Sequence, residues 1–456
     1  SSRGLRLALH GSCSPRASEY SCTGGMLHLT PLLLLTTERW GLFQLNLTAS
    51  VAKVANPFEV PLSATFTHSS GSVLTVTGFY DGDDQFKLRF SPPLEGAWSY
   101  ITKSSLGPLD AVKGQVMATA PGASIHGPVE SKEFGLYYAD GAPHFSVGTT
   151  CYQWSSMNFA RQRQTLATLA QQGFNKIRMT IFPKWYVYNH ANPVEAGAAF
   201  LRAPGSASTN ASAWGCVGEH CPSMAGSFDL TRFNVSYWQN YEALLSQLRA
   251  LNIVADIIVF HPYDGGHWGF DCLGGRDPQS YDTTNDKRYL HYMAARLSAY
   301  SNVWWAMANE WSFNACKGRG VDGADAWGQA NASPIWDELF ETLIEADPYG
   351  RQTSIHNGNL LYNHSRPWIS HVSLQSHMTD TAELRAHYGK PVVWDEERYE
   401  GDIPPEWGAL TGAEEAGRIS PDDLTSVQCP DALSLLCPPP PHASPLRSPL
   451  GALCQA

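Results

Sequence analysis

The sequence predicts an α/β fold, a (β/α)8 TIM barrel preceded by a small antiparallel β-sandwich. Residues 38–120 contain short segments that alternate apolar and polar side chains and are separated by Gly, Asp and Pro. Residues 133–412 instead alternate strand-like and helix-like segments in units of about 30 residues, an order that produces a parallel sheet. Hydrophobic residues make up 43% of the 456 residues and charged residues 16%, a composition typical of globular domains with large cores.

The first predicted domain, residues 38–120, is an immunoglobulin-like accessory sandwich. Residues 74–80 alternate in polarity, Asp81-Gly82 forms a turn, and residues 86–90 alternate again, which is the pattern of a β-hairpin. Several such strands pack as two antiparallel sheets. Residues 1–37 are rich in Ser, Gly and Arg and lack periodicity, so we expect a processing or disordered segment there.

The second predicted domain, residues 133–412, contains seven strands and five helices. The strands are 144–149, 174–181, 253–260, 303–308, 353–356, 369–374 and 391–394, and the helices are 159–172, 237–251, 286–300, 334–346 and 381–388. The segment 253–260 is almost wholly apolar, as a buried parallel strand is. An open doubly wound sheet is the alternative, but no Gly-x-Gly-x-x-Gly motif follows the first strand.

The eighth strand of the barrel is not recognisable. Residues 413–456 form a divergent tail rich in Pro and Ser, and residues 438–441 are all Pro. Either the last strand is cryptic or the sequence ends early, and we favour an early end. An unclosed barrel leaves its seventh strand at an exposed edge, which makes an inactive, truncated barrel an alternative to an active enzyme.

Charge and aromatic content narrow the possible partners. The formal net charge of −11 disfavours nucleic acid and an anionic membrane surface, because both require a basic face. The 15 Trp, 19 Tyr and 18 Phe provide rings on which sugar faces stack, so we expect an oligo- or polysaccharide substrate, although most Trp residues also serve as core. No Cys-x-x-Cys pair indicates zinc, and no cofactor is expected.

Ten Cys residues and five Asn-x-Ser/Thr sequons favour the secretory route, so we expect a secreted glycoprotein although no clear signal peptide is visible. Cys216 and Cys221 could pair locally, and Cys272 and Cys316 follow two successive strands. The sequons are at Asn46, Asn210, Asn234, Asn331 and Asn363.

Two carboxylates follow strands of the predicted barrel, where the carboxyl ends of the strands form the functional face. Glu310 follows strand 303–308, and Glu396 follows strand 391–394. Two carboxyl groups on opposite sides of a barrel mouth are what glycoside cleavage requires, and a separation of about 5–5.5 Å is typical of a retaining enzyme. We therefore predict Glu310 and Glu396 as the catalytic pair.

Further phrases of the sequence make the resemblance to known enzymes specific. Asn309-Glu310 and the later Glu396 resemble the pattern of clan A glycoside hydrolases. Additional sequence motifs resemble those of the apiosidase-like barrels, which follow an N-terminal sandwich of unknown function. The phrases, within residues 38–412, are Trp40-Gly41, Asn56-Pro57-Phe58, Gly173-Phe174-Asn175-Lys176-Ile177-Arg178, Phe260-His261-Pro262-Tyr263-Asp264, Asn302-Val303-Trp304-Trp305, Ala308-Asn309-Glu310, Asp347-Pro348-Tyr349-Gly350, Ser354-Ile355-His356-Asn357 and Tyr399-Glu400-Gly401.

The resemblance implies a role for each of these residues. Glu310 would be the acid and then the base, and Glu396 the nucleophile that forms a glycosyl-enzyme. Asn309 would hydrogen-bond a sugar hydroxyl, and Arg178 would keep the nucleophile ionised and oriented. Further side chains at strand ends are expected to contact the sugar, namely Trp154, His261, Tyr263, Asp264, His356, Asn357, Gln375, His377 and Tyr399.

Several alternatives remain open at this point. Asp395, Glu397 and Glu400 compete for the role of nucleophile; we prefer Glu396 because strand alternation turns Asp395 to the other face. A metal site built from His261, His267 and Asp264 has only generic spacing. An inverting enzyme on the same barrel would have carboxyl groups about 6.5–9.5 Å apart, and a binding protein without turnover would keep the pocket alone.

Overall fold

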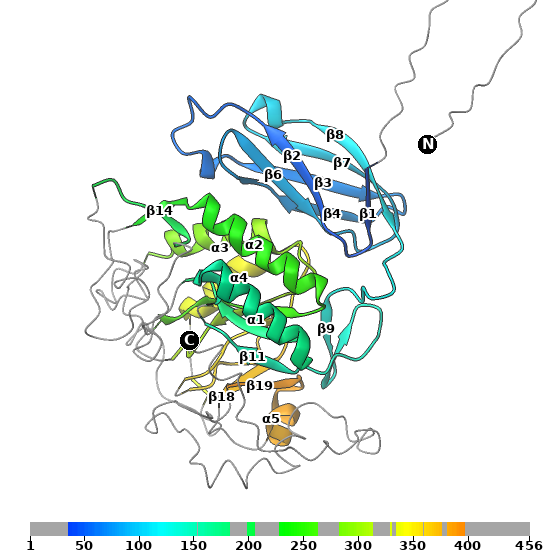
Figure 1. Ribbon diagram of the computed structural model, residues 1–456, viewed down its shortest axis with the longest axis vertical. Coiled ribbons are helices and arrows are strands. Elements are labelled where there is room, and N and C mark those ends of the chain that lie inside the picture. The colour runs from blue at the N-terminus through cyan, green and yellow to red at the C-terminus, as the bar shows by residue number, and fades with distance from the viewer. Residues whose placement is uncertain are drawn as a thin grey trace, which may run out of the picture. The chain divides into compact units, whose positions relative to one another are not determined.

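The computed structural model describes residues 35–152, 154–182, 198–205, 228–262, 282–312, 329–330, 334–358, 360–375 and 381–396. The described chain starts with two antiparallel sheets, apart from one parallel edge strand, β1 (Figure 1). One sheet has the order β1-β8-β7-β3-β4 and the other β2-β6-β5. Their strands are β1 Leu35–Glu38, β2 Phe43–Thr48, β3 Leu62–His68, β4 Val73–Thr77, β5 Phe79–Tyr80, β6 Gln85–Phe90, β7 Gly96–Ser104 and β8 Lys113–Thr119.

Polarity alternation produces the core between these two sheets. β3 buries Leu62, Ala64 and Phe66 on one face, and Phe66 stacks on Phe90 of the other sheet with ring centroids 3.9 Å apart. The predicted strand 74–80 is two strands, since the chain passes from one sheet to the other at Gly78. A Cβ at Gly78 would lie 2.6 Å from the side chain of Leu62, so this crossing requires glycine.

The parallel strands of the second domain occupy all seven predicted segments. β11 Gly148–Thr150, β12 Lys176–Thr180, β15 Val254–Phe260, β16 Val303–Ala308 and β17 Thr353–Ser354 form one parallel sheet, and β18 Val372–Gln375 pairs in parallel with β19 Val392–Glu396. A bridge between His356 and Ser373 connects the two sets. β19 contacts β11, but within the described residues the two form no ladder and the barrel is not closed. The predicted fold class, parallel strands that alternate with helices in barrel order, is confirmed.

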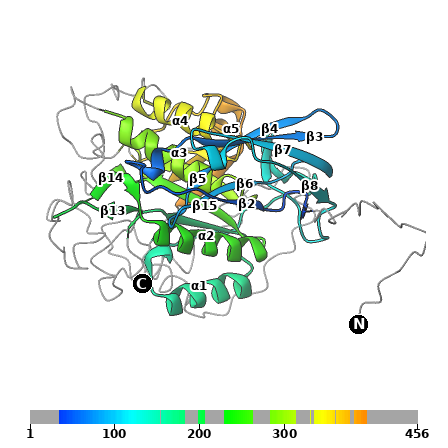
Figure 2. The same ribbon diagram turned by 90° about the horizontal axis from the view of Figure 1, so that it is seen from above.

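The helices lie on the outer side of these strands (Figures 1 and 2). They are α1 Phe159–Gln172, α2 Val235–Ala250, α3 Thr284–Leu297, α4 Pro334–Ala346 and α5 Thr381–Tyr388. Asn158 caps α1 by accepting from the backbone N–H of Arg161, and Gly173 ends it in the left-handed conformation with φ 73°. The side hairpin β13 Phe200–Arg202 with β14 Phe228–Phe233 precedes α2.

Alternate strand residues face the helices or the barrel interior. Trp305 and Met307 of β16 belong to the core shared with the helices, whereas Trp304 packs inside the barrel against Val254 and Val393. The hairpin of β9 Val129–Lys132 and β10 Gly135–Tyr138 covers the amino-terminal end of the barrel with Val129 and Leu136. The interior is therefore filled with side chains below the site.

A buried group of charges joins the sandwich to the barrel helices. Arg89 of β6 donates to the Glu242 carboxylate of α2 at 2.7 Å. Arg296 of α3 donates to the same carboxylate at 2.5 Å and to Asp81 of the sandwich at 2.6 Å. Their side chains are at most 7% exposed. Burial opposes the charge of each group, but the two guanidinium groups lower the pKa of Glu242 below its usual value.

We expect Glu242→Gln to lower the free energy of unfolding by about 3–5 kcal/mol, because Arg89 and Arg296 would keep buried charges without their shared partner. Urea unfolding followed by tryptophan fluorescence measures this change. The control is Glu338→Gln, which removes an exposed ion pair to Lys287 at 2.6 Å and should cost less than about 1 kcal/mol. Equal losses in the two variants would contradict this interpretation of the interface.

Candidate active site

The end of β19 carries a bulge that places two carboxylates inside the barrel mouth. Leu374 pairs with Trp394 and Gln375 pairs with Glu396, so Asp395 is the extra residue. The indole of Trp394 donates to Thr381 of α5, on the outside. Regular alternation therefore directs Asp395 inward, and the bulge turns Glu396 inward as well. The expectation that Asp395 faces away from the site is wrong, because it assumed an unbroken strand.

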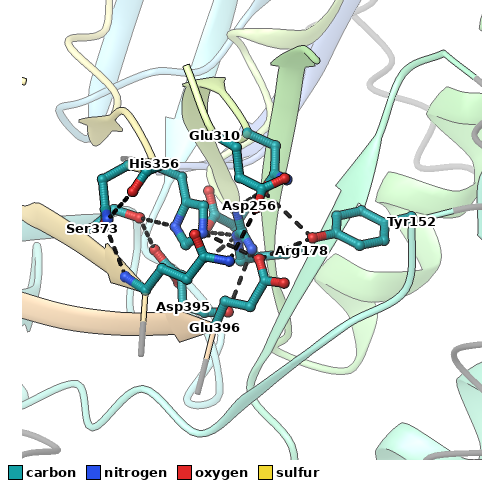
Figure 3. A network of polar contacts seen from close by, with 12 residues as sticks. Tyr152, Arg178, Asp256, Glu310, His356, Ser373, Asp395 and Glu396 are labelled. Atoms are coloured by element: carbon teal, nitrogen blue, oxygen red, sulfur yellow. Dashed lines mark hydrogen bonds and ion pairs between the residues drawn. The ribbon is translucent and has the colours of Figure 1, made fainter. Parts of the chain in front are cut away.

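Glu396 is 9% exposed and receives two hydrogen bonds on its Oε2 atom. The Tyr152 hydroxyl donates at 3.1 Å, and Nε2 of His356 lies at 3.1 Å (Figure 3). Burial raises the pKa of this carboxyl, but the hydrogen bond and charge of His356, and then the charge of Arg178, have the opposite effect. The pKa of Glu396 therefore lies below its usual value, which favours the ionised form.

Glu310 follows β16 in a left-handed backbone conformation with φ 47°. Such a conformation is uncommon for a residue other than glycine, and it occurs preferentially at functional sites. The carboxyl group accepts from Gln375 Nε2 at 3.1 Å and from Asn309 Nδ2 at 3.3 Å. The amide group of Gln375 on β18 and that of the preceding residue, Asn309, thus fix the orientation of the Glu310 carboxyl group.

Arg178 of β12 is 1% exposed and orients Asn309. Its Nη2 donates to Asn309 Oδ1 at 2.8 Å, and because arginine only donates, the amide nitrogen of Asn309 must point toward Glu310. Nη1 donates to the backbone carbonyl of Asp395 at 3.4 Å. Arg178 therefore acts on Glu396 through its charge and the neighbouring backbone, whereas the prediction expected it to hold the nucleophile itself.

One layer deeper, Lys176 lies between two aspartates. Its Nζ pairs with Asp256 at 3.1 Å and forms a second, close ion pair with Asp395, whose other oxygen accepts from Ser373 at 2.5 Å. The side chains of Lys176, Asp256 and Asp395 are at most 4% exposed. Burial alone would raise the pKa of Asp395, but Lys176 and Arg178 lower it far below its usual range.

The other predicted sugar contacts have different positions. Asn357 is buried and accepts from the backbone N–H of Gln375 at 2.9 Å, so it positions Gln375. Trp154 lies in the core against α1, where its indole donates to the Gln162 carbonyl, and the structure gives it no place at the mouth because it starts a short 3-10 turn after β11. His261 is buried beside the ring of Phe182. Tyr263, Asp264, His377 and Tyr399 lie outside the described residues.

The described part of the chain offers no cluster of metal ligands. Among the described residues, no group of three or more His, Cys, Asp or Glu side chains could hold a metal ion. Two members of the conceivable metal site, Asp264 and His267, lie beyond the described ranges. No helix among the described residues combines the length and apolar character that a membrane crossing needs.

Sequence reasoning missed Tyr152, Lys176, Asp256 and Ser373. Three of them could have been identified from the sequence, because Lys176, Asp256 and Ser373 occupy inward positions of predicted strands. A charged residue inside an apolar strand such as 253–260 indicates a buried ion pair. Tyr152 follows β11 at the mouth, and only the three-dimensional arrangement brings its hydroxyl to Glu396.

The sequence and the structure of this chain match those of known proteins. Residues 131–423 match the family described as the apiosidase-like catalytic domain, and residues 36–105 match a domain of unknown function, DUF5060. A presumed glycoside hydrolase from Bacteroides vulgatus ATCC 8482 is 35% identical with a TM-score of 0.69; the match covers 83% of this chain and 68% of that one. A search of curated proteins finds no match.

Two further solved structures are more distant. A glycoside hydrolase family 5 protein from Bacteroides vulgatus ATCC 8482 is 15% identical with a TM-score of 0.39, over 61% of this chain and 55% of that one. An endo-1,4-beta-mannanase from Rhizomucor miehei is 12% identical with a TM-score of 0.41, over 60% and 83%. These two similarities are too weak to carry an argument.

The barrel, its site and these matches define the protein as a glycosidase. The chain belongs to the apiosidase-like family, with the DUF5060 domain before the catalytic domain. The resemblance inferred from its sequence motifs is thereby confirmed.

We expect Tyr152→Phe to move the acidic limb of the kcat/KM profile to higher pH. The Tyr152 hydrogen bond helps to lower the pKa of Glu396, so its removal raises that pKa and the ionised form is lost at a higher pH. We expect kcat/KM at neutral pH to fall about tenfold, the usual effect of losing a hydrogen bond to a charged group. The measurement is glycoside hydrolysis as a function of pH.

The matched control is Tyr237→Phe, which removes a buried hydroxyl that donates to the Ile181 carbonyl away from Glu396. This variant should keep the wild-type acidic limb. A Tyr152→Phe profile identical to that of the control would show that Tyr152 does not act on the ionisation of Glu396.

Proposed function

We propose that this glycosidase cleaves O-glycosidic bonds with retention of configuration, with Glu396 as nucleophile and Glu310 as acid and base. The observation that carries the proposal is that both carboxyl groups lie near Tyr152 at the carboxyl ends of the strands, each with its own set of partners (Figure 3). Glu396 is surrounded by groups that favour its ionised form, which a nucleophile needs. Glu310 is held by amide groups that fix its direction.

In the first step, Glu396 attacks the anomeric carbon while Glu310 gives its proton to the departing glycosidic oxygen. The bond between the anomeric carbon and that oxygen breaks, and a glycosyl ester on Glu396 forms. In the second step, Glu310 removes a proton from a water molecule that attacks the same carbon, and Glu396 leaves as carboxylate. Two inversions at one carbon give net retention.

The neighbouring polar groups have supporting roles in this proposal. Tyr152 and His356 bind Glu396 on one oxygen and so limit rotation of the carboxylate. Asn309 accepts from Arg178 with its carbonyl oxygen and donates with its amide nitrogen to Glu310, so Arg178 sets the direction of the acid and base through Asn309. Positioning of this kind supplies much of the rate enhancement, because the reacting groups need no reorganisation.

Oligo- or polysaccharides are the proposed substrates, and the secretory route is the proposed localisation. The match to a glycoside hydrolase supports the first. The second is supported by Cys151, which is disulfide-bonded, and by the sequon at Asn46, whose side chain is exposed on β2. Disulfide bonds persist mainly in oxidising compartments, and N-glycans require an accessible asparagine.

The decisive experiment measures turnover of a panel of aryl glycosides by wild-type protein and by Glu310→Gln and Glu396→Gln. Both variants should lose at least about a thousandfold in kcat/KM, since each removes a group that takes part in bond breaking. With Glu396→Ala, added azide should restore turnover and give a glycosyl azide of inverted configuration, because azide replaces the missing nucleophile. The anomer first formed by wild type, measured by NMR, should match the substrate.

The control is Glu345→Gln on α4, a carboxyl group on the exposed outer side, which should keep wild-type turnover. Activity that survives either Glu310→Gln or Glu396→Gln would place the chemistry elsewhere. An inverted product from wild type would exclude the glycosyl-enzyme and indicate a single displacement.

A further inference from the structure

A chain of hydrogen bonds runs behind Glu396 from one carboxylate to the other (Figure 3). Asp395 Oδ2 accepts from the Ser373 hydroxyl at 2.5 Å, and Ser373 Oγ lies 3.2 Å from His356 Nδ1. His356 Nε2 lies 3.1 Å from Glu396 Oε2. Asp395, Ser373 and His356 come from three neighbouring strands and strand ends, and His356 and Ser373 are fully buried.

Counting protons along this chain determines the state of the imidazole. Ser373 has one hydroxyl proton, and the ionised Asp395 can only accept, so that proton points to Asp395. Ser373 can then only accept from His356, which requires a proton on Nδ1. Glu396, when ionised, also only accepts, which requires a proton on Nε2. Every contact in the chain is satisfied only if His356 carries protons on both ring nitrogens.

The balance of buried charge points the same way. Around Glu396 the described structure buries two cations, Lys176 and Arg178, against three carboxylates, Asp256, Asp395 and Glu396. A buried excess charge is costly, and a proton on His356 removes it. Burial and the charge of Arg178 bring the pKa of His356 below its usual value, although Glu396 and Asp395 raise it. The second proton is therefore held by the contacts of the two ring nitrogens with Ser373 and Glu396, and it depends on both carboxylates remaining ionised.

We propose that His356 is an imidazolium in the resting enzyme and that Asp395, acting through Ser373, is the positioning residue that keeps it against Glu396. Lys176 holds Asp395 in place for this purpose. The proposal deepens the assignment of Glu396 as nucleophile and rests on it for its catalytic consequence. The titratable and charged groups that face these hydrogen bonds are Tyr152, His371, Lys176, Arg178, Glu310 and Asp256.

The direct test is the protonation state of His356, read from ring 15N resonances of protein labelled in its histidines. The sequence has 16 His, and the signals of His356 are those that disappear in His356→Gln. At the pH of activity, wild type should show two protonated ring nitrogens for His356. Ser373→Ala should show the neutral ring, because Nδ1 loses the acceptor that connects it to Asp395.

Ser354→Ala is the matched control. Ser354 lies on β17 two residues before His356 and is equally buried, but its hydroxyl has no hydrogen-bond partner in the described structure. This variant should keep the wild-type resonances of His356. A neutral His356 ring in wild type, or a Ser373→Ala spectrum identical to that of Ser354→Ala, would overturn the proposal, and neither result depends on measurable turnover.

The kinetic consequence follows from the same variants. In Ser373→Ala, kcat/KM should fall about tenfold and its acidic limb should move to higher pH, because Glu396 loses a neighbouring positive charge. Ser354→Ala should remain within about twofold of wild type. If Glu396→Gln retains activity, the assigned nucleophile is wrong, and the NMR result still decides the protonation state of His356. If Glu396→Gln is inactive and the acidic limb of the Ser373→Ala kcat/KM profile stays at the wild-type pH, only the proposal about Asp395 fails.

Discussion

The ion pair between Lys176 and Asp395 inside the barrel is the contact on which the geometry of the site depends. Asp395 is the extra residue of the β19 bulge, and the bulge is what turns Glu396 into the mouth. The side chain of Asp395 is held by Lys176 and Ser373, and its backbone carbonyl by Arg178. Ser373 belongs to β18, which pairs with β19, whereas Lys176 and Arg178 belong to β12, one strand beyond β11 on the other side, so the bulge is fixed from both sides of β19.

Burying these charges has a cost that the barrel meets by pairing them. Lys176 contacts Asp256 as well as Asp395, and Arg178 places its guanidinium within 4 Å of both aspartates. Replacement of such a group by apolar side chains of similar size is often neutral or stabilising, so stability alone does not explain its presence. Its position directly below two catalytic candidates explains it better, because charged groups in a dry interior act strongly on a neighbouring carboxylate.

The sequence predicted the strands better than it predicted the site. Apolar segments with βα spacing located all seven parallel strands, because buried parallel strands leave a clear hydrophobic signal. The glutamates could be placed at strand ends by the same pattern. The bulge at Asp395 could not be predicted, because a bulge depends on pairing with Ser373 and Lys176 from distant segments. For the same reason the hydroxyl of Tyr152 was missed, and Trp154 was expected at the mouth although it packs against α1.

Buried ion pairs also connect the accessory sandwich to the helices that support the site. Arg89 and Asp81 of the sandwich bind α2 and α3 through Glu242 and Arg296. α2 leads into β15, which carries Asp256, and α3 leads into β16, which ends next to Glu310. A change in how the sandwich holds these two helices would therefore move the partner of Lys176 and the proposed acid and base together. The sandwich therefore helps to build the site through the two helices that support the strands carrying Asp256 and preceding Glu310.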